Sequence, residues 1–560
     1  MLVIALLAAG ALITAPAPAP AHSASSDSTA YGSPDALIHY ARGRLLEEED
    51  RIEEALAEYY RAVANDPHAV APLRRVSELS ARKGDNAANA RSLEFAQRAL
   101  AVAPADPRSL WLEGAALFNL GRYADSIAPL VAAAEGDSEN VEYWRTLARA
   151  ADHERRYDLL VRAWRVSADL DDGDPETWFQ LAGALARTGD FAEADSALRI
   201  AREGNPARPG IEFLGGWIEE GLGHDDEAID DYARHLKLHP DDNTTRQRRV
   251  ALLAGRERWA EAYREAQVVS KFDPRDAEAL GTAADLAFRA GKPAEGREML
   301  RTLERLDSSD PDNAGRAILV LANHKRAAEG VAVARGWSDA HPGDWRGPLL
   351  EARALALADS TDAAITRARE AVDAAPDSLV PRLVLGRIAQ KARRWKLAVA
   401  TWEGVLQRRP REIPVTLDLA YCREQDGDVE GAVTAARGAL AESPDSPTVL
   451  NFLGYLLADH DRELHEAASL IDRAVTQEPD NGAFVDSKGW VLYRLGKLAE
   501  ARLELERAAR LTHGDPTVLE HLGDVYRALR LLDLARAQYR RSLSGDATNQ
   551  RVRNKLEAIR

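Results

Sequence analysis

Apolar side chains recur at three-and-four residue spacing along most of the chain, a period that predicts amphipathic α-helices. In residues 482–515, for example, Val485 and Leu492 mark the apolar side of one helix and Leu505 marks that of a second. Gly496 falls between them, where a short turn is expected. The pattern therefore predicts pairs of helices joined by tight, glycine-containing turns.

The two-helix pattern returns every 34 residues. Residues that hold this phase mark the ends of successive units: Pro206, Pro240, Pro274, Ser308, Pro342, Pro376, Pro410 and Pro444. From this phase we expect fifteen units between residues 36 and 549. Prolines, some preceded by aspartate, are predicted to end the second helix of a unit and to begin the next unit. One helix pair cannot bury both of its faces, so the units are predicted to stack into a superhelical solenoid.

Particular residue types recur at fixed places in the units. They are best seen in four sets: Leu110, Gly114 and Ala133; Trp178, Leu181, Ala194, Ala201 and Pro206; Leu453, Gly454, Ala474 and Pro479; and Leu522, Gly523, Tyr526 and Ala535. This series resembles the signature of tetratricopeptide repeats (TPRs). The resemblance implies an all-α, right-handed superhelical solenoid of about fifteen tandem helix-turn-helix repeats. Residues 451–529 also resemble a block found in exported bacterial TPR proteins.

The ends of the chain differ from the repeats. Residues 1–13 are almost wholly apolar and too few to span a bilayer, and Ala19 and Ala21 suit a cleavage site, so we predict a signal peptide over residues 1–21. A basic n-region is missing, so either the true start lies upstream or the signal is atypical. We then expect a disordered linker over residues 22–35, a continuous repeat array over 36–549 and a C-terminal capping helix over 550–560. The predicted location is exported, either periplasmic or associated with the outer membrane.

The composition argues against some classes of partner and against an intramolecular disulfide. The formal net charge of −17 argues against a protein that neutralises nucleic-acid phosphates, so no nucleic-acid partner is expected. No segment after the leader is apolar enough to span a membrane, although peripheral association with the envelope stays open. Cys422 is the only cysteine, which excludes an intramolecular disulfide. It is predicted to be a buried small hydrophobe.

Catalytic motifs are absent from the sequence, so an enzyme, a cofactor and a metal site are not predicted. His235 and His239 form a pair that could hold a divalent metal on one helix face, but histidines near a helix C-terminus also bind free carbonyls. We favour the structural interpretation of this pair.

Recognition is expected in a concave groove lined by the first helix of each unit, where peptides or partner helices commonly lie. Projection of the units onto this scheme places aromatic and arginine side chains in the groove: Trp111, Phe118, Phe179, Phe213, Trp217, Arg387, Tyr421, Phe452, Tyr455, Trp490, Tyr493, Arg494 and Arg527. Aromatic rings bury much area with few rotors, and arginine pairs with carboxylates. Many of these rings could equally pack as core between neighbouring helices.

The sequence thus favours a non-enzymatic scaffold that binds protein partners of unknown identity in its groove and helps to assemble or stabilise an envelope complex. An accessory protein of exopolysaccharide or pilus export is the alternative, in which aromatic rings would stack on sugars.

Overall fold

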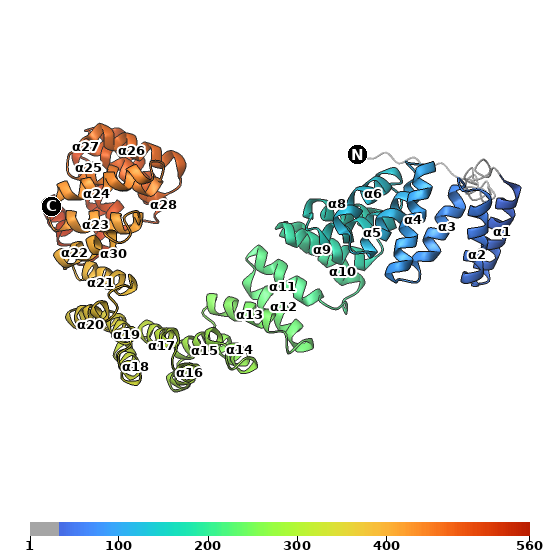
Figure 1. The fold of residues 1–560 in the computed structure, drawn as a ribbon. Coiled ribbons are helices and arrows are strands. Elements are labelled where there is room, and N and C mark those ends of the chain that lie inside the picture. The colour runs from blue at the N-terminus through green and yellow to red at the C-terminus, as the bar shows by residue number, and fades with distance from the viewer. Residues whose placement is uncertain (1–32, 560) are drawn as a thin grey trace, which may run out of the picture. The chain divides into compact units, whose positions relative to one another are not determined.

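The computed structural model describes residues 33–559 and is helical throughout that range. It contains 31 α-helices and no strand within those residues, and successive helices run as antiparallel pairs along the chain (Figure 1). The predicted signal peptide (1–21) and nearly all of the predicted linker (22–35) lie outside the described residues. The all-α repeat fold is therefore confirmed.

The fifteen pairs within the described range each consist of an odd-numbered first helix and an even-numbered second helix. The first helices are α1 (Pro34–Glu48), α3 (Val70–Ala81), α5 (Pro107–Asn119), α7 (Val141–His153), α9 (Pro175–Thr188), α11 (Ile211–Leu222), α13 (Asn243–Gly255), α15 (Ala277–Arg289), α17 (Pro311–Asn323), α19 (Arg346–Leu357), α21 (Val380–Lys391), α23 (Ile413–Gln425), α25 (Pro447–Asp459), α27 (Gly482–Arg494) and α29 (Pro516–Ala528). The second helices are α2 (Ile52–Asn65), α4 (Asn86–Val102), α6 (Tyr123–Gly136), α8 (Tyr157–Leu170), α10 (Phe191–Gly204), α12 (Asp225–Leu238), α14 (Trp259–Phe272), α16 (Pro293–Leu306), α18 (Ala327–Ala340), α20 (Thr361–Ala374), α22 (Trp395–Leu406), α24 (Val429–Glu442), α26 (Leu464–Gln477), α28 (Leu498–Leu511) and α30 (Leu532–Gly545). A last helix, α31 (Gln550–Glu557), follows the final pair.

Aspartate followed by proline begins several first helices. Asp106 accepts a hydrogen bond from the Ser109 amide at 2.9 Å, and Asp515 accepts one from the Thr517 amide at 2.8 Å, with proline at the next position in both. The carboxylate satisfies an otherwise free N–H of the first turn, and proline has no N–H to lose there. Asp-Pro therefore fixes where these units begin.

Within residues 33–559, the turn between the two helices of a pair always contains at least one residue in the left-handed conformation. In each pair between residues 33 and 559 the residue at the same place has a positive φ: Asp50, Gly84, Gly121, Arg155, Gly189, Gly223, Glu257, Gly291, Lys325, Asp359, Arg393, Gly427, Asp461, Gly496 and Arg530. Only about half are glycine, so the prediction of glycine-containing turns holds for those pairs alone. Elsewhere the packing of the two helices imposes the conformation on residues that disfavour it.

The two helices of a pair meet where a small residue on one faces a large residue on the other. A β-carbon on Gly386 of α21 would stand 2.5 Å from the Trp402 ring of α22, which is fully buried. In the α17/α18 pair the sizes are reversed, because Gly330 of α18 lies against Ile318 of α17. The arrangement with glycine on the first helix recurs at Gly43 with Tyr59, Gly114 with Leu130, Gly216 with Tyr232, Gly454 with Ile471, Gly489 with Leu505 and Gly523 with Tyr539. Volume complementarity thus sets the distance between the helices.

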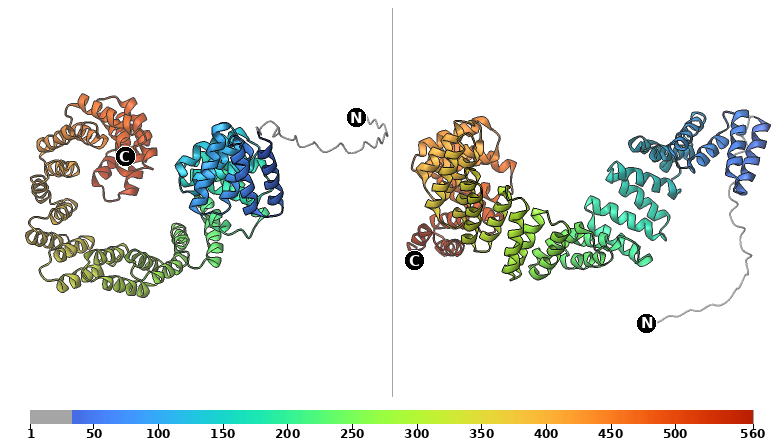
Figure 2. Two further views of the ribbon diagram at one scale, coloured as in Figure 1. Left: turned by 45° about the vertical axis from the view of Figure 1, so that its right-hand side comes forward. Right: turned by 60° about the horizontal axis from the view of Figure 1, so that its bottom comes forward.

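The chain divides into two compact units, an N-terminal unit (Met1–Val269) and a C-terminal unit (Ser270–Arg560). Each has its own core, which runs from repeat to repeat and not around one centre. Within the C-terminal unit, α15, α17, α19 and α21 lie along the inner side of an arc, and α16, α18, α20 and α22 lie on its outer side (Figure 1). The arc curls back at its C-terminal end (Figure 2, left).

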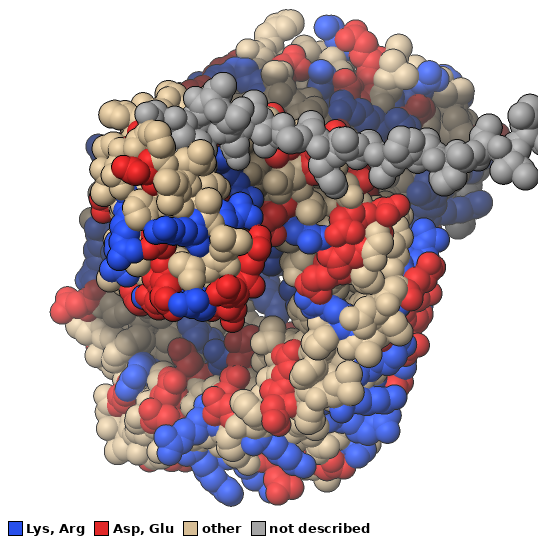
Figure 3. Space-filling model, turned by 90° about the vertical axis from the view of Figure 1, so that its right-hand side faces the viewer, with Lys and Arg blue, Asp and Glu red and all other residues tan. Residues whose placement is uncertain are grey.

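On the face that Figure 3 shows, acidic and basic side chains are interspersed, and neither sign covers a broad area. None of the described helices is long and apolar enough to cross a membrane.

Gly489 provides a test of the helix crossing. Its β-carbon would stand 2.5 Å from Cγ of Leu505 and 3.2 Å from the Leu505 backbone nitrogen. We expect Gly489→Val to lower the free energy of unfolding by about 1–3 kcal/mol, since it overpacks the crossing. Urea denaturation followed by circular dichroism would measure this.

The matched control is Gly438→Ala on α24, where a β-carbon meets nothing within 4 Å. It should raise stability by up to about 1 kcal/mol through helix propensity. Equal effects of the two substitutions would show that the crossing does not need its glycine.

Candidate functional site

The exposed sides of the first helices in the C-terminal unit form one face, which we call the inner face. On α17, for example, Ala317, Ile318 and Leu321 are buried against neighbouring helices, whereas Arg316 and Leu319 are exposed. This split follows from the helical period, which turns every third or fourth side chain to the same side.

The inner face is open from α17 to α23. Leu319 is 53%, Leu357 42%, Val380 43% and Tyr421 38% exposed, although all four are apolar or aromatic. Arg387 lies among them and is also exposed. Of the predicted groove residues, Arg387 and Tyr421 therefore lie where a partner can reach them.

The inner face is closed from α25 to α29, where its aromatic side chains pack together. Trp490 is only 8% exposed, because the Tyr493 ring stacks 5.2 Å away on one side and the His521 ring stacks 4.2 Å away on another. Phe452 and Tyr455 are half-buried and pack against the same core. The structure thus brings these four predicted aromatics together, but as a packed cluster.

A buried ion pair crosses this aromatic cluster. Nδ1 of His521 on α29 lies 3.0 Å from both carboxylate oxygens of Asp486 on α27. Burial lowers the pKa of His521, but the Asp486 charge outweighs burial and holds that pKa above its usual value. The Asp486 carboxylate thus favours the protonated form of His521, and the pair joins two consecutive repeats.

The predicted arginines at the closed end are engaged within the chain. Arg494 donates to Asp461 on the turn after α25 at 2.8 Å, and its guanidinium lies over the Trp490 ring. Arg527 lies 3.7 Å from Asp524 on its own helix. Neither is free to meet a partner's carboxylate without giving up a contact.

The last helix supplies positive charge to the same end. Glu520 of α29 is 1% exposed and accepts hydrogen bonds from Arg551 at 2.8 Å and Lys555 at 2.6 Å, both on α31. Buried carboxylates require such partners, because desolvation of an unpaired charge is costly. Helix α31 therefore completes the charge balance of the closed end.

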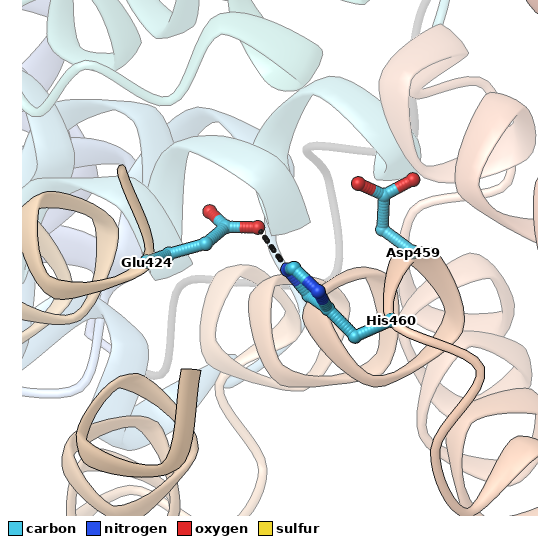
Figure 4. Close-up of side chains that lie close together, drawn as sticks. All are labelled: Glu424, Asp459 and His460. Carbon is cyan, nitrogen blue, oxygen red and sulfur yellow. Dashed lines mark hydrogen bonds and ion pairs between the residues drawn. The ribbon is translucent and has the colours of Figure 1, made fainter. Parts of the chain in front are cut away.

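Three side chains at the rim could approach a metal ion. Glu424 of α23, Asp459 of α25 and the adjacent His460 place their ligating atoms within 4.8 Å of one another (Figure 4). However, Oε1 of Glu424 already lies 2.9 Å from Nε2 of His460, and Asp459 accepts from the Trp490 indole at 3.1 Å. These contacts account for the cluster as a joint between α23, α25 and α27.

The Tyr455 hydroxyl interacts electrostatically with the carboxylates of this cluster. Burial raises the pKa of its hydroxyl far above the usual range, and the charges of Asp459, Asp486 and Glu424 raise the pKa further. The hydroxyl is therefore neutral at every physiological pH.

The five predicted groove residues of the N-terminal unit are half-buried between repeats. Trp111 donates its indole N–H to Thr146 at 3.0 Å and stacks on Tyr143 at 5.7 Å. Phe118 packs edge-on against Tyr123, Phe179 lies under the Arg208 guanidinium and Phe213 lies 5.6 Å from the His235 ring. Trp217 packs against the core of the same unit. These rings take part in packing and keep part of their surface exposed.

The other candidate residues that the sequence suggested, the histidine pair and Cys422, have structural roles. His235 lies 2.9 Å from Asp242, the carboxylate that caps α13, so the histidine pair supports a helix start. Cys422 is fully buried, and burial raises the pKa of its thiol to about 11, which confirms the small-hydrophobe interpretation.

Sequence reasoning missed several exposed inner-face residues, namely Arg316, Leu319, Arg353, Leu357 and Lys391. The signal was present in the register, because Leu319, Arg353, Arg387 and Tyr421 follow one another at 34-residue intervals. The selection of aromatic residues and three arginines passed over Leu319 and Arg353.

Comparison with known proteins supports a repeat family. A family model described as tetratricopeptide repeat matches residues 22–70, 179–243, 383–447, 417–483, 453–516 and 487–550, which together span half of the chain. TPR repeat-containing protein PA4667 of Pseudomonas aeruginosa is 37% identical over 127 residues, which is 22% of this chain and 21% of that protein. The match thus spans about a fifth of the relative's length.

Solved structures give more distant likenesses. A thermophilic TPR protein of Thermus thermophilus is 22% identical, with a TM-score of 0.30 over 32% of this chain and 98% of that one. A structure of Naa15/Naa10 bound to HypK is 12% identical, with a TM-score of 0.40 over 94% of this chain and 96% of that one.

The His521–Asp486 pair predicts a pH dependence of stability. The folded-state pKa of His521 lies above the unfolded value of about 6.5. The contribution of the pair to the free energy of unfolding is therefore fully present below about pH 6.5 and is lost as the pH rises through the folded-state pKa. The difference in melting temperature between wild type and His521→Asn should therefore shrink between pH 6 and pH 9. A difference that stays constant or grows over this range would exclude a charged pair.

Proposed function

Because the chain belongs to the tetratricopeptide repeat family, whose members typically act as non-catalytic scaffolds, we propose that it binds partner proteins through the open inner face of α17 to α23 and thereby assembles or stabilises a complex of the bacterial envelope. The observation that carries this proposal is the row of exposed side chains Leu319, Leu357, Val380 and Tyr421 on four consecutive first helices. Single exposed apolar residues are ordinary, but an exposed apolar or aromatic side chain on each of four consecutive first helices favours a partner.

The envelope location rests on the leader. Its apolar run, followed by small residues at Ala19 and Ala21, supports export to the periplasm or the outer membrane. The net charge of −17 disfavours nucleic acid as the partner. An accessory role in exopolysaccharide or pilus export is the second candidate, supported by the exposed ring of Tyr421.

Site-specific photocrosslinking would test the proposed face. We expect a benzophenone amino acid in place of Leu319 or Leu357, in the tagged full-length protein of the native host, to capture a defined set of envelope proteins. Mass spectrometry of the crosslinked species would identify them.

Leu503 on the outer helix α28 is 60% exposed and serves as the matched control position. Crosslinks of equal yield and identity from Leu503 would contradict the inner face as the binding site. Recovery of polysaccharide alone would favour the export-accessory role.

A further inference from the structure

Four basic side chains on the inner face have no partner of opposite charge among residues 33–559. From α3 to α29, the described lysines and arginines of the first helices each contact a carboxylate or a backbone carbonyl, apart from Arg316, Arg353, Arg387 and Lys391. These four show neither a hydrogen bond nor an ion pair to any residue that the structure describes. They are therefore an exception within this set of helices.

The four residues lie on three consecutive first helices. Arg316 is on α17, Arg353 is on α19, and Arg387 and Lys391 are on α21; α17 contacts α19, and α19 contacts α21. All four are exposed. Arg387 and Lys391 are four residues apart and so project from the same side of α21, where two like charges repel each other slightly. Stability of the fold does not explain such a placement.

Few acidic groups offset this charge. Asp312, in the first turn of α17, is the exposed acidic residue on these three helices. Glu351 of α19 is 2% exposed and pairs with Arg367 of α20. From α17 to α21 the open inner face is thus locally basic, in a chain whose net charge is −17.

At the closed end of the inner face, buried charged side chains are paired with side chains of opposite charge. At the closed end, Glu520 receives Arg551 and Lys555 from the next helix, and Asp486 receives His521 from the next repeat. A neighbouring element supplies the opposite charge in both cases. From α17 to α21 none of the described elements does so, which leaves these charges available to a partner of opposite charge.

We propose that the open inner face binds a partner segment that is acidic and carries apolar side chains between its carboxylates, an inference that rests on the proposed scaffold function. Arg353 and Arg387 would pair with the carboxylates, and guanidinium groups suit them because they donate two parallel hydrogen bonds. Leu319, Leu357 and Val380 would contact the apolar side chains between the charges. The exposed leucines and valine distinguish this surface from one that binds a bare polyanion.

Peptide binding to the full-length protein tests the chemistry. The probe is a fluorescein-labelled peptide of repeated Glu-Glu-Leu, compared with the same peptide of repeated Gln-Gln-Leu. We expect fluorescence anisotropy to show binding of the glutamate probe, at least tenfold weaker binding of the glutamine probe, and a loss of affinity as salt is raised from 50 to 500 mM.

Charge reversal locates the site. The double variant R353E/R387E should bind the glutamate probe at least tenfold more weakly than wild type, whereas R369E, which reverses an exposed, unpaired arginine on the outer helix α20, should bind like wild type. All the substituted side chains are exposed, so circular dichroism and the melting temperature should not change.

Three outcomes would overturn the inference. They are equal binding of the two probes, wild-type affinity in R353E/R387E, and tenfold tighter binding of single-stranded RNA or dextran sulfate than of the glutamate probe. The scaffold proposal is judged separately: if Leu319 crosslinks a defined partner whose captured segment is not acidic, and R353E/R387E captures it equally well, the acidic specificity fails while the binding face stands.

Discussion

The close crossing of the two helices in each repeat is the contact on which the rest of the structure depends. Where Gly386 meets Trp402, or Gly523 meets Tyr539, a β-carbon would stand 2.5 Å from the ring. The two helix axes can therefore lie this close only because glycine has no side chain. The same spacing forces the residue in the connecting turn to a positive φ, even where it is Arg155 rather than glycine. Once the pair is locked in this way, one side of the first helix has no partner within its own repeat, and that side becomes the inner face.

Along the C-terminal unit the inner face changes from exposed, unpaired charges to buried, paired ones, because only a buried charge needs a partner within the protein. At the closed end, Asp486 and Glu520 are removed from water, and each is matched by His521 or by Arg551 and Lys555. From α17 to α21 the surface stays hydrated, so Arg353 and Arg387 need no internal counterpart and remain available for one from outside. Structural and recognition roles are thus separated along a single surface, according to its exposure.

The repeat register predicted most of the fold and only part of the site. The helical period and the Asp-Pro starts at Asp106 and Asp515 located the helix pairs, because both signals act within a few residues. Of the predicted groove residues, Arg387 and Tyr421 lie on the exposed part of the inner face. Trp490 was also placed on the inner face, but its register could not reveal that His521 stacks against its ring, because that contact depends on how α29 packs against α27.

The sequence by itself determined the all-helical repeat, its period, the starts of its helices and its family, since each follows from local chemistry that recurs every 34 residues. Tertiary structure decided which inner-face residues are covered and which are free. Arg494 and Arg353 are both arginines on the exposed side of a first helix, yet Arg494 is held by Asp461 and Trp490, whereas Arg353 forms no hydrogen bond or ion pair with a described residue. That difference arises from the packing of neighbouring repeats, which a single repeat's sequence does not encode.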